Sequence, residues 1–333
     1  MANLETTYMG LKLKNPLIVG ASHLTADMDQ IKKLEEAGAA AIVTKSLFEE
    51  QIHLDKLKFD EERERYYYRH PMMVTVGAPV EHGGPKEHLY WVERAKKECA
   101  IPVIASLNAL DPDTWIEYAG RLADTGADAL ELNFYSSPRP LEQDASEAEK
   151  EQLDVIRAVT EAVNIPVSVK LSFFYTNPLH FIQAADRAGA KGLVLFNRLF
   201  QPEIDIQKET HVFPSHLSHA EDHRLPLRFT GLLADHVDAD ICSSTGIYQG
   251  EDAVKMILAG AACFQVVSTL IKHRSGRIGG ILAGISDWMD EKGYADLNAF
   301  RGKMSKEKLP DPWAYTRAQY VQWIMHPERF IER

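Results

Sequence analysis

The sequence has 333 residues, 45% hydrophobic and 26% charged, a composition typical of a globular protein. Its 37 Lys and Arg against 48 Asp and Glu give a formal net charge of −11, which argues against nucleic acid or an anionic membrane as the main partner. Three cysteines lack the spacing of a zinc or iron–sulfur site, and neither a signal peptide nor an apolar run of about 18 residues is visible. We therefore expect a cytoplasmic protein without a membrane segment.

A repeated unit of strand and helix runs along the chain. Short apolar runs, each followed by a polar turn and a segment with helical spacing, occupy residues 15–22, 39–45, 102–108, 127–133, 166–171, 191–197, 238–244 and 261–268. Four of these runs follow a glycine that we expect to end a helix: Gly38, Gly126, Gly189 and Gly260. Eight such units predict a parallel sheet closed into a (β/α)8 TIM barrel, with a doubly wound open sheet as the alternative.

Three segments fall outside the repeat. Residues 46–100 follow the second predicted strand and residues 198–228 follow the sixth, and we expect both excursions to cover the active face of the barrel. Residues 303–333 form a helical C-terminal extension that covers the bottom or side of the barrel or extends a dimer contact. No linker separates a second domain, so residues 1–333 are predicted to form one domain with a core at about 11–302.

Polar residues end the predicted strands, where (β/α)8 barrels place their chemistry. A lysine at the end of an apolar strand is costly to desolvate unless it meets an anion, and asparagine offers both a donor and an acceptor to a planar heterocycle. The Ser/Thr/Gly turns after the last two strands suit a phosphate held by backbone N–H groups. The set predicts a phosphorylated planar cofactor, first of all FMN: Lys45, Asn108, Asn133, Lys170, Asn197, Ser243, Ser244, Thr245, Gly246, Ser268 and Thr269.

From Leu11 to about Gly302 the chain resembles the dihydroorotate dehydrogenase family, especially its soluble class-1 branch. The resemblance rests on motifs in the same order as in the family: "LKNPLIVGAS", "AGAAAIVTKS", "ELN", "IPVSVKL", "TGIYQGEDAVKMILAGAACFQVVSTL" and "MDEKGYADLNAFRGK". It implies an eight-stranded barrel that binds FMN and oxidises dihydroorotate to orotate in pyrimidine biosynthesis. An active-site base would remove a proton from one carbon while a hydride passes from the neighbouring carbon to flavin N5.

The resemblance also implies roles for individual residues. Lys45 and Asn133 would contact both flavin and substrate, Asn197 would lie beside them, and Lys170 would lie near flavin N1. The other residues implied to bind the cofactor are Gly20, Ala21, Ser22, Ser46, Asn108, Gly231, Ser244, Thr245, Gly246, Ser268 and Thr269. No metal is implied. The resemblance also leads us to expect a homodimer. Because the chain begins at the first strand without the membrane extension of the quinone-linked branch, we expect a soluble electron acceptor or a redox partner protein.

The substrate side departs from the family pattern. Arg139 follows Pro138 where the family has asparagine, and Arg198 follows Asn197 where the family has serine or threonine, so both arginines are candidate anion clamps. The family base, a cysteine or a serine, lies just before the proline. Alignment on that proline selects Ser137, which we prefer, and alignment on Asn133 selects Ser136.

Three alternatives to dihydroorotate oxidation stay open. One is a flavoenzyme of the same fold that acts on another carboxylated or cyclic unsaturated compound. Another is a flavin-binding electron-transfer subunit of a larger redox complex, and the third is a flavin-free aldolase that uses Lys170 as a Schiff base. The histidines of the second excursion, His211, His216, His219 and His223, are interpreted as part of a polar lid rather than as metal ligands.

Overall fold

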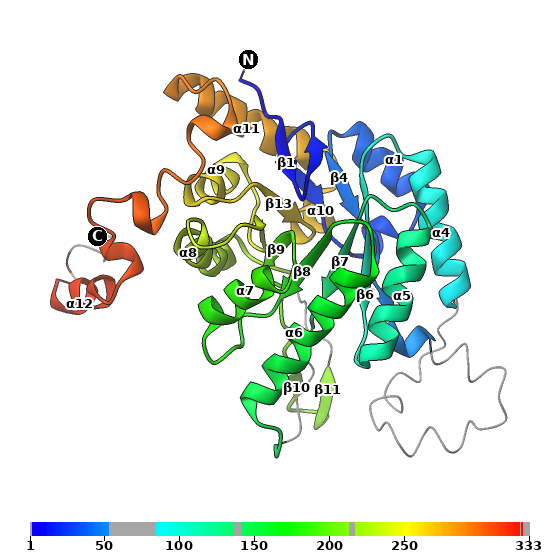
Figure 1. Cartoon of the computed structure of the whole chain (residues 1–333). Helices are drawn as coiled ribbons and strands as arrows, with labels where there is room; N and C mark the ends of the chain where they lie inside the picture. Colours follow the sequence, from blue (N-terminus) through cyan, green and yellow to red (C-terminus); the bar gives the residue numbers. More distant parts are fainter. Residues whose placement is uncertain (1, 53–83, 136–140, 213–216, 327, 329–333) are drawn as a thin grey trace.

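Eight parallel strands form a closed barrel in the computed structural model, which describes residues 2–52, 84–135, 141–212, 217–326 and 328 (Figure 1). The strands pair in the order β4-β3-β13-β12-β9-β8-β7-β6, and a β4–β6 pairing closes the ring. Their bounds are β3 Leu17–Val19, β4 Ala41–Val43, β6 Val103–Asn108, β7 Ala129–Asn133, β8 Val167–Leu171, β9 Gly192–Leu195, β12 Asp240–Ser244 and β13 Cys263–Val266. A short strand, β5 (Leu47–Phe48), pairs with the end of β6. All eight predicted strands and the TIM barrel are confirmed, and the open sheet is excluded.

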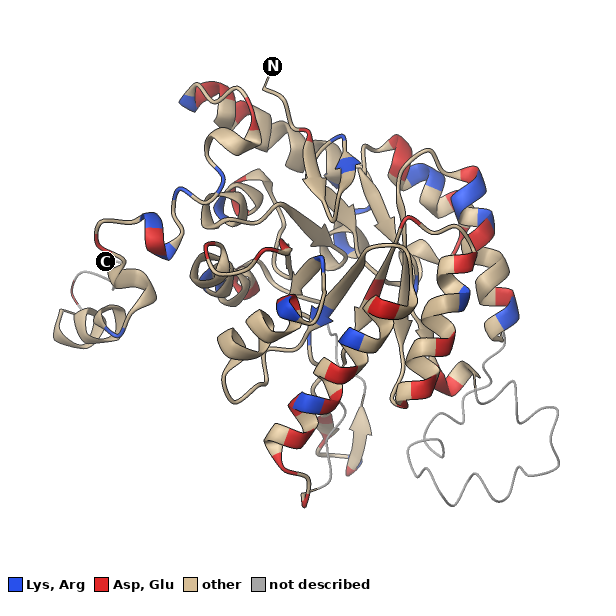
Figure 2. Cartoon of the chain, viewed as in Figure 1, with Lys and Arg blue, Asp and Glu red and all other residues tan. Residues whose placement is uncertain are grey.

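Helices surround the barrel and carry many of the Lys, Arg, Asp and Glu residues (Figure 2). They are α1 Met28–Glu36, α4 Pro85–Glu98, α5 Pro112–Asp124, α6 Ala145–Ala162, α7 Pro178–Arg187, α8 Arg224–Leu233, α9 Gly250–Ala259, α10 Ser268–His273, α11 Arg277–Lys292 and α12 Ala318–Met325. Sequence signals fix several helix starts: the side chains of Asp27, Asp111 and Asn177 accept backbone N–H groups in the first turns of α1, α5 and α7. None of the helices in the described ranges is long and apolar enough to cross a bilayer.

The four glycines predicted to end helices adopt the left-handed backbone region. Their φ angles are +110° at Gly38, +81° at Gly126, +108° at Gly189 and +126° at Gly260. At Gly260 a Cβ would also lie 2.3 Å from the Cβ of Ala234, so both conformation and space require glycine there. The predicted ends of these helices are confirmed.

An N-terminal hairpin closes the bottom of the barrel. Strands β1 (Thr6–Tyr8) and β2 (Leu11–Leu13) pair in antiparallel fashion, and Tyr8 packs with the apolar side chains of the barrel interior. The backbone N–H of Met9 donates to Asp240 Oδ2 at 2.7 Å, at the start of β12. Because this end is filled, the carboxyl ends of the strands are the open end of the barrel.

The excursion after the sixth barrel strand contains a second hairpin that the sequence analysis did not predict. Its strands, β10 (Glu203–Asp205) and β11 (Thr210–Val212), are exposed and polar, so they lack the apolar alternation by which strands are recognised. The 3-10 helix η3 (Ala220–His223) leads from this excursion into α8.

The C-terminal extension lies against the side of the barrel at α8. After η4 (Leu297–Ala299), which ends the core, it comprises two 3-10 helices, η5 (Lys306–Lys308) and η6 (Trp313–Tyr315), followed by α12. The guanidinium of Arg228 in α8 donates to the carbonyl oxygens of Ala314 at 3.1 Å and Tyr315 at 3.2 Å. Helix α12 lies farther out, with Tyr320 and Trp323 on its surface (Figure 1).

Candidate active site

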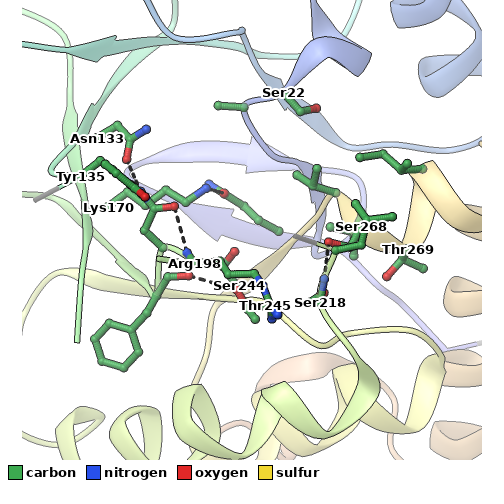
Figure 3. Close-up of a pocket in the computed structure, with 18 of the residues that line it drawn as sticks. Ser22, Asn133, Tyr135, Lys170, Arg198, Ser218, Ser244, Thr245, Ser268 and Thr269 are labelled. Atoms are coloured by element: carbon green, nitrogen blue, oxygen red, sulfur yellow. Dashed lines mark hydrogen bonds between the residues drawn. The ribbon is translucent and has the colours of Figure 1, made fainter. Parts of the chain in front are cut away.

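A cavity of about 660 Å³ lies at the carboxyl ends of the barrel strands. Its size suits a cofactor together with a small substrate. The sequence analysis assigned many of the residues that line it: Ala21, Ser22, Lys45, Ser46, Asn133, Lys170, Asn197, Arg198, Ser244, Thr245, Gly246, Ser268 and Thr269. Figure 3 shows Asn133, Tyr135 and Lys170 on one side of the pocket and Ser268 and Thr269 on the opposite side.

Amides at the strand ends form a connected network. Asn197 Nδ2 donates to Asn133 Oδ1 at 2.5 Å, and Asn133 Nδ2 reaches Ser46 Oγ at 3.5 Å. Asn108 Nδ2 donates to the carbonyl oxygen of Asn133 at 2.8 Å, from outside the cavity lining. These bonds fix which atoms of Asn133 and Asn197 face the cavity, so the two amides are oriented before a ligand binds.

Lys170 lies beside Asn133 because the two residues are direct partners across β7 and β8. Its side chain is buried, and Nζ donates to Gln265 Oε1 at 3.0 Å. Gln265 Nε2 in turn donates to Glu131 Oε2 at 2.5 Å, and Lys170 Nζ lies 3.9 Å from Glu131 Oε1. Burial raises the pKa of Glu131 above its usual value, against the effects of Lys170 and Gln265. The ammonium is thereby fixed at the floor of the cavity.

Arg198 contributes a second cation, and the excursion orients it. Its Nη1 donates to Asp222 Oδ2, and its backbone N–H donates to Asn197 Oδ1 at 3.0 Å. Partial burial raises the pKa of Asp222, but hydrogen bonds from the His219 backbone and Arg198 outweigh it, and the pKa lies below the usual value. The expectation that residues 198–228 cover the active face is confirmed for the segments that line the cavity, 198, 200, 217 and 218.

Lys45 lines the cavity, and its charge helps to lower the pKa of a histidine in α4. Burial and the charge of Lys45 lower the pKa of His88 to about 4, so the imidazole is neutral at physiological pH. His88 Nε2 has no hydrogen-bond partner among the described residues. The sequence analysis did not single out this histidine.

The turn after β12 and the start of α10 form the far end of the cavity. Thr245 and Gly246 have φ angles of +82° and +77°, and a Cβ on Gly246 would lie 2.2 Å from the backbone nitrogen of His223. The backbone N–H of Ser218 donates to Ser268 Oγ at 2.9 Å (Figure 3). Lys272 Nζ donates to the Ser218 carbonyl oxygen at 2.8 Å. Small side chains and a lysine therefore lie together at this end, as a phosphate group requires.

Several lining residues were missed from the sequence. Tyr135, Phe196 and Phe200 form an aromatic wall, with the Tyr135 hydroxyl accepting the Phe200 N–H at 3.0 Å. Gln265 also lines the cavity, and one signal could have identified it, since it is a polar residue inside an otherwise apolar strand.

Some predicted residues lie elsewhere. Gly231 is inside α8, where a Cβ would meet the Tyr315 hydroxyl at 2.1 Å, so the structure does not bring it to the cavity. Gly20 lies under the lining, where a Cβ would be 2.9 Å from Gln265 Oε1. Ser136, Ser137 and Arg139 lie outside the described residues.

A metal site is not formed by the part of the chain that the structure describes, where no three His, Cys, Asp or Glu side chains converge. His211 lies on exposed β11, whereas His223 lies 3.8 Å from Asp252. His216 is outside the described residues.

Comparisons with known proteins point to one family. Residues 3–289 match the family model described as dihydroorotate dehydrogenase. Two similar proteins are named dihydroorotate dehydrogenase B (NAD(+)), catalytic subunit: one from Methanosarcina mazei, 30% identical, with 90% of this chain and 94% of the relative covered, and one from Thermoplasma volcanium, 27% identical, with 91% and 98% covered. Members of this family are FMN flavoproteins. The chain belongs to the dihydroorotate dehydrogenase family.

Proposed function

We propose that this protein oxidises dihydroorotate to orotate in pyrimidine biosynthesis, with FMN bound in the cavity at the carboxyl ends of the barrel strands. The observation that carries the proposal is the coincidence of two facts. The family match covers residues 3–289, and the cavity within this range holds two lysines and two hydrogen-bonded asparagines at the strand ends.

The residues present fit FMN. The turn at Gly246 and the small side chains of Ser268 and Thr269 line the end of the cavity that we assign to the phosphate, and Lys272 binds the neighbouring Ser218 carbonyl oxygen. At the opposite end Lys170 supplies a fixed positive charge next to Asn133, which suits the carbonyl and N–H edge of the flavin. Bound FMN supplies N5, the atom that accepts a hydride from the substrate.

The side chains of this protein bind and orient the substrate and exclude water. Asn133 and Asn197 present amide groups to a cyclic diamide, and Lys45 presents an ammonium to a carboxylate. The aromatic wall of Tyr135, Phe196 and Phe200 excludes water from the reacting carbons. Oxidation breaks two C–H bonds and forms one C=C bond. The hydride leaves from one carbon, and a base removes the proton from the other; Ser137 is our preferred base, with Ser136 as the alternative.

The relatives give a basis for partners. Because both compared relatives are named catalytic subunits of an NAD(+)-linked enzyme, we propose that this protein passes electrons to a partner protein or another soluble acceptor. A homodimer in the cytoplasm completes the proposal.

Anaerobic titration with dihydroorotate tests the reaction. Purified protein should carry FMN, and the visible absorbance of the flavin should bleach as dihydroorotate reduces it. A colourless protein that takes up no added FMN contradicts the cofactor assignment. A yellow protein that dihydroorotate leaves unbleached contradicts the substrate assignment alone.

A second candidate function rests on the Arg198 and Asp222 pair. A guanidinium oriented at the cavity favours another carboxylated, unsaturated substrate. The two candidate functions can be separated by testing other saturated carboxylic acids for their ability to bleach the flavin of the wild type and of Arg198→Lys. A different acid that bleaches the wild type, and bleaches Arg198→Lys at least tenfold more slowly, supports the second function.

A further inference from the structure

Glu131 is a buried carboxylate that no step of the proposed reaction uses. It lies in β7, two residues before Asn133, and its side chain is fully buried in the barrel interior. It does not line the cavity, whereas both of its polar neighbours, Lys170 and Gln265, do. Burying an unpaired carboxylate costs free energy. We therefore expect the group that Glu131 stabilises to be one of its polar neighbours.

The direction of the hydrogen bonds indicates how Glu131 is used. An ammonium can only donate, so the Lys170 contact at 3.0 Å makes Gln265 Oε1 the acceptor. Gln265 Nε2 must then donate to Glu131 Oε2, as the 2.5 Å contact shows. The charge on Lys170 therefore fixes the direction of both hydrogen bonds, and the last acceptor is the Glu131 carboxylate.

The surroundings of the second carboxylate oxygen, Glu131 Oε1, indicate that the carboxylate is ionised. Among the residues that the structure describes, Oε1 has no hydrogen-bond partner, so a proton placed there would be a buried donor without an acceptor. The same oxygen lies 3.9 Å from Lys170 Nζ, where a negative charge is stabilised. Burial raises the pKa of Glu131 above its usual value and opposes ionisation, and the Lys170 ammonium and the Gln265 hydrogen bond offset only part of this effect.

We propose that Glu131 is a positioning residue that holds the Lys170 ammonium through Gln265 and offsets its charge, and thereby sets the reduction potential of bound FMN. The inference rests on the proposed binding of FMN and does not depend on the substrate. Reduction adds negative charge to the flavin, which an uncompensated ammonium stabilises. The Glu131 carboxylate therefore keeps the potential lower than Lys170 alone would make it.

The test is the midpoint potential of FMN in Glu131→Gln, measured by spectroelectrochemical titration without substrate. Glutamine keeps the shape and removes the charge. We expect the variant to favour reduced over oxidised FMN about 10- to 100-fold more than the wild type, a rise of about 30 to 60 mV for a two-electron couple. Asp240→Asn is the matched control, because it removes a partly buried carboxylate at the opposite end of the barrel, where it bonds Met9. Its potential should be unchanged.

A double variant separates positioning from a direct effect. In a Lys170→Gln background, Glu131→Gln should shift the potential by less than half as much as in the wild type. An equal shift in both backgrounds overturns the inference, because Glu131 would then act on the flavin without Lys170. An unchanged potential in Glu131→Gln overturns it too, since Glu131 would then be neutral already.

A change in the FMN potential can be distinguished from a loss of folding and from a failure of the proposed function. Thermal melting and FMN content are measured for each variant. If Glu131→Gln does not fold, Glu131→Asp replaces it, and the shorter side chain should raise the potential by a smaller amount; no rise overturns the inference. Absence of FMN from the wild type overturns both proposals, whereas failure of dihydroorotate to bleach a yellow wild type removes only the proposed substrate.

Discussion

Replacement of Gly246 by alanine should damage both the barrel and its cofactor site. The residue has a φ of +77°, where an L side chain costs about 1 to 2 kcal/mol. The added Cβ would lie 2.2 Å from His223 N and 2.8 Å from the Asp222 carbonyl carbon. Both atoms belong to the backbone, so η3 must move, at a cost of about 1 to 3 kcal/mol typical of overpacking.

The sum, about 2 to 5 kcal/mol, gives a measurable change in melting temperature. An unfolding entropy of about 2.1 cal/mol/K per residue amounts to about 0.7 kcal/mol/K for this chain, so Tm should fall by about 3 to 7 °C. Displacement of the turn should also weaken FMN binding at least tenfold, as fluorescence titration of the apoprotein would show. The control is Gly276→Ala, at φ −57° with no atom within 4 Å of the new Cβ. Equal Tm values and FMN affinities for Gly246→Ala and wild type would refute the reasoning.

Two further predictions concern His88 and Arg228. His88 has a folded pKa of about 4 against an ordinary value of 6.5, so it contributes stability above pH 6.5 that is lost as the pH falls toward 4. His88→Gln should therefore lose less stability than wild type between these pH values in urea denaturation, and parallel curves would contradict this. Arg228→Ala should lose about 1 to 3 kcal/mol of local stability, because its bonds to Ala314, Tyr315 and Gln319 are removed. Limited proteolysis should cut the extension after residue 303 faster at unchanged FMN content; unchanged cleavage would contradict it.

The sequence by itself determined the repeat of strand and helix and the polar residues at the strand ends. Those features are local: an apolar run, a glycine after a helix and a lysine at the end of a strand are each recognisable within about ten residues. In a parallel barrel all strands end at the same rim, so Lys45, Asn133, Lys170 and Asn197 were expected to meet, and they do line one cavity.

Only the tertiary structure decided which of these groups bond to one another. Lys170 and Gln265 are 95 residues apart, and Gln265 and Glu131 are 134 apart, yet they form one buried chain. No local pattern encodes such a contact, because it depends on the order and register in which distant strands pair. The same reason explains the position of Gly231, which the family resemblance assigned to the phosphate cradle. This residue lies in α8 and packs against Tyr315 of η6. The sequence thus determined which residues reach the rim, and the closure of the barrel decided their partners.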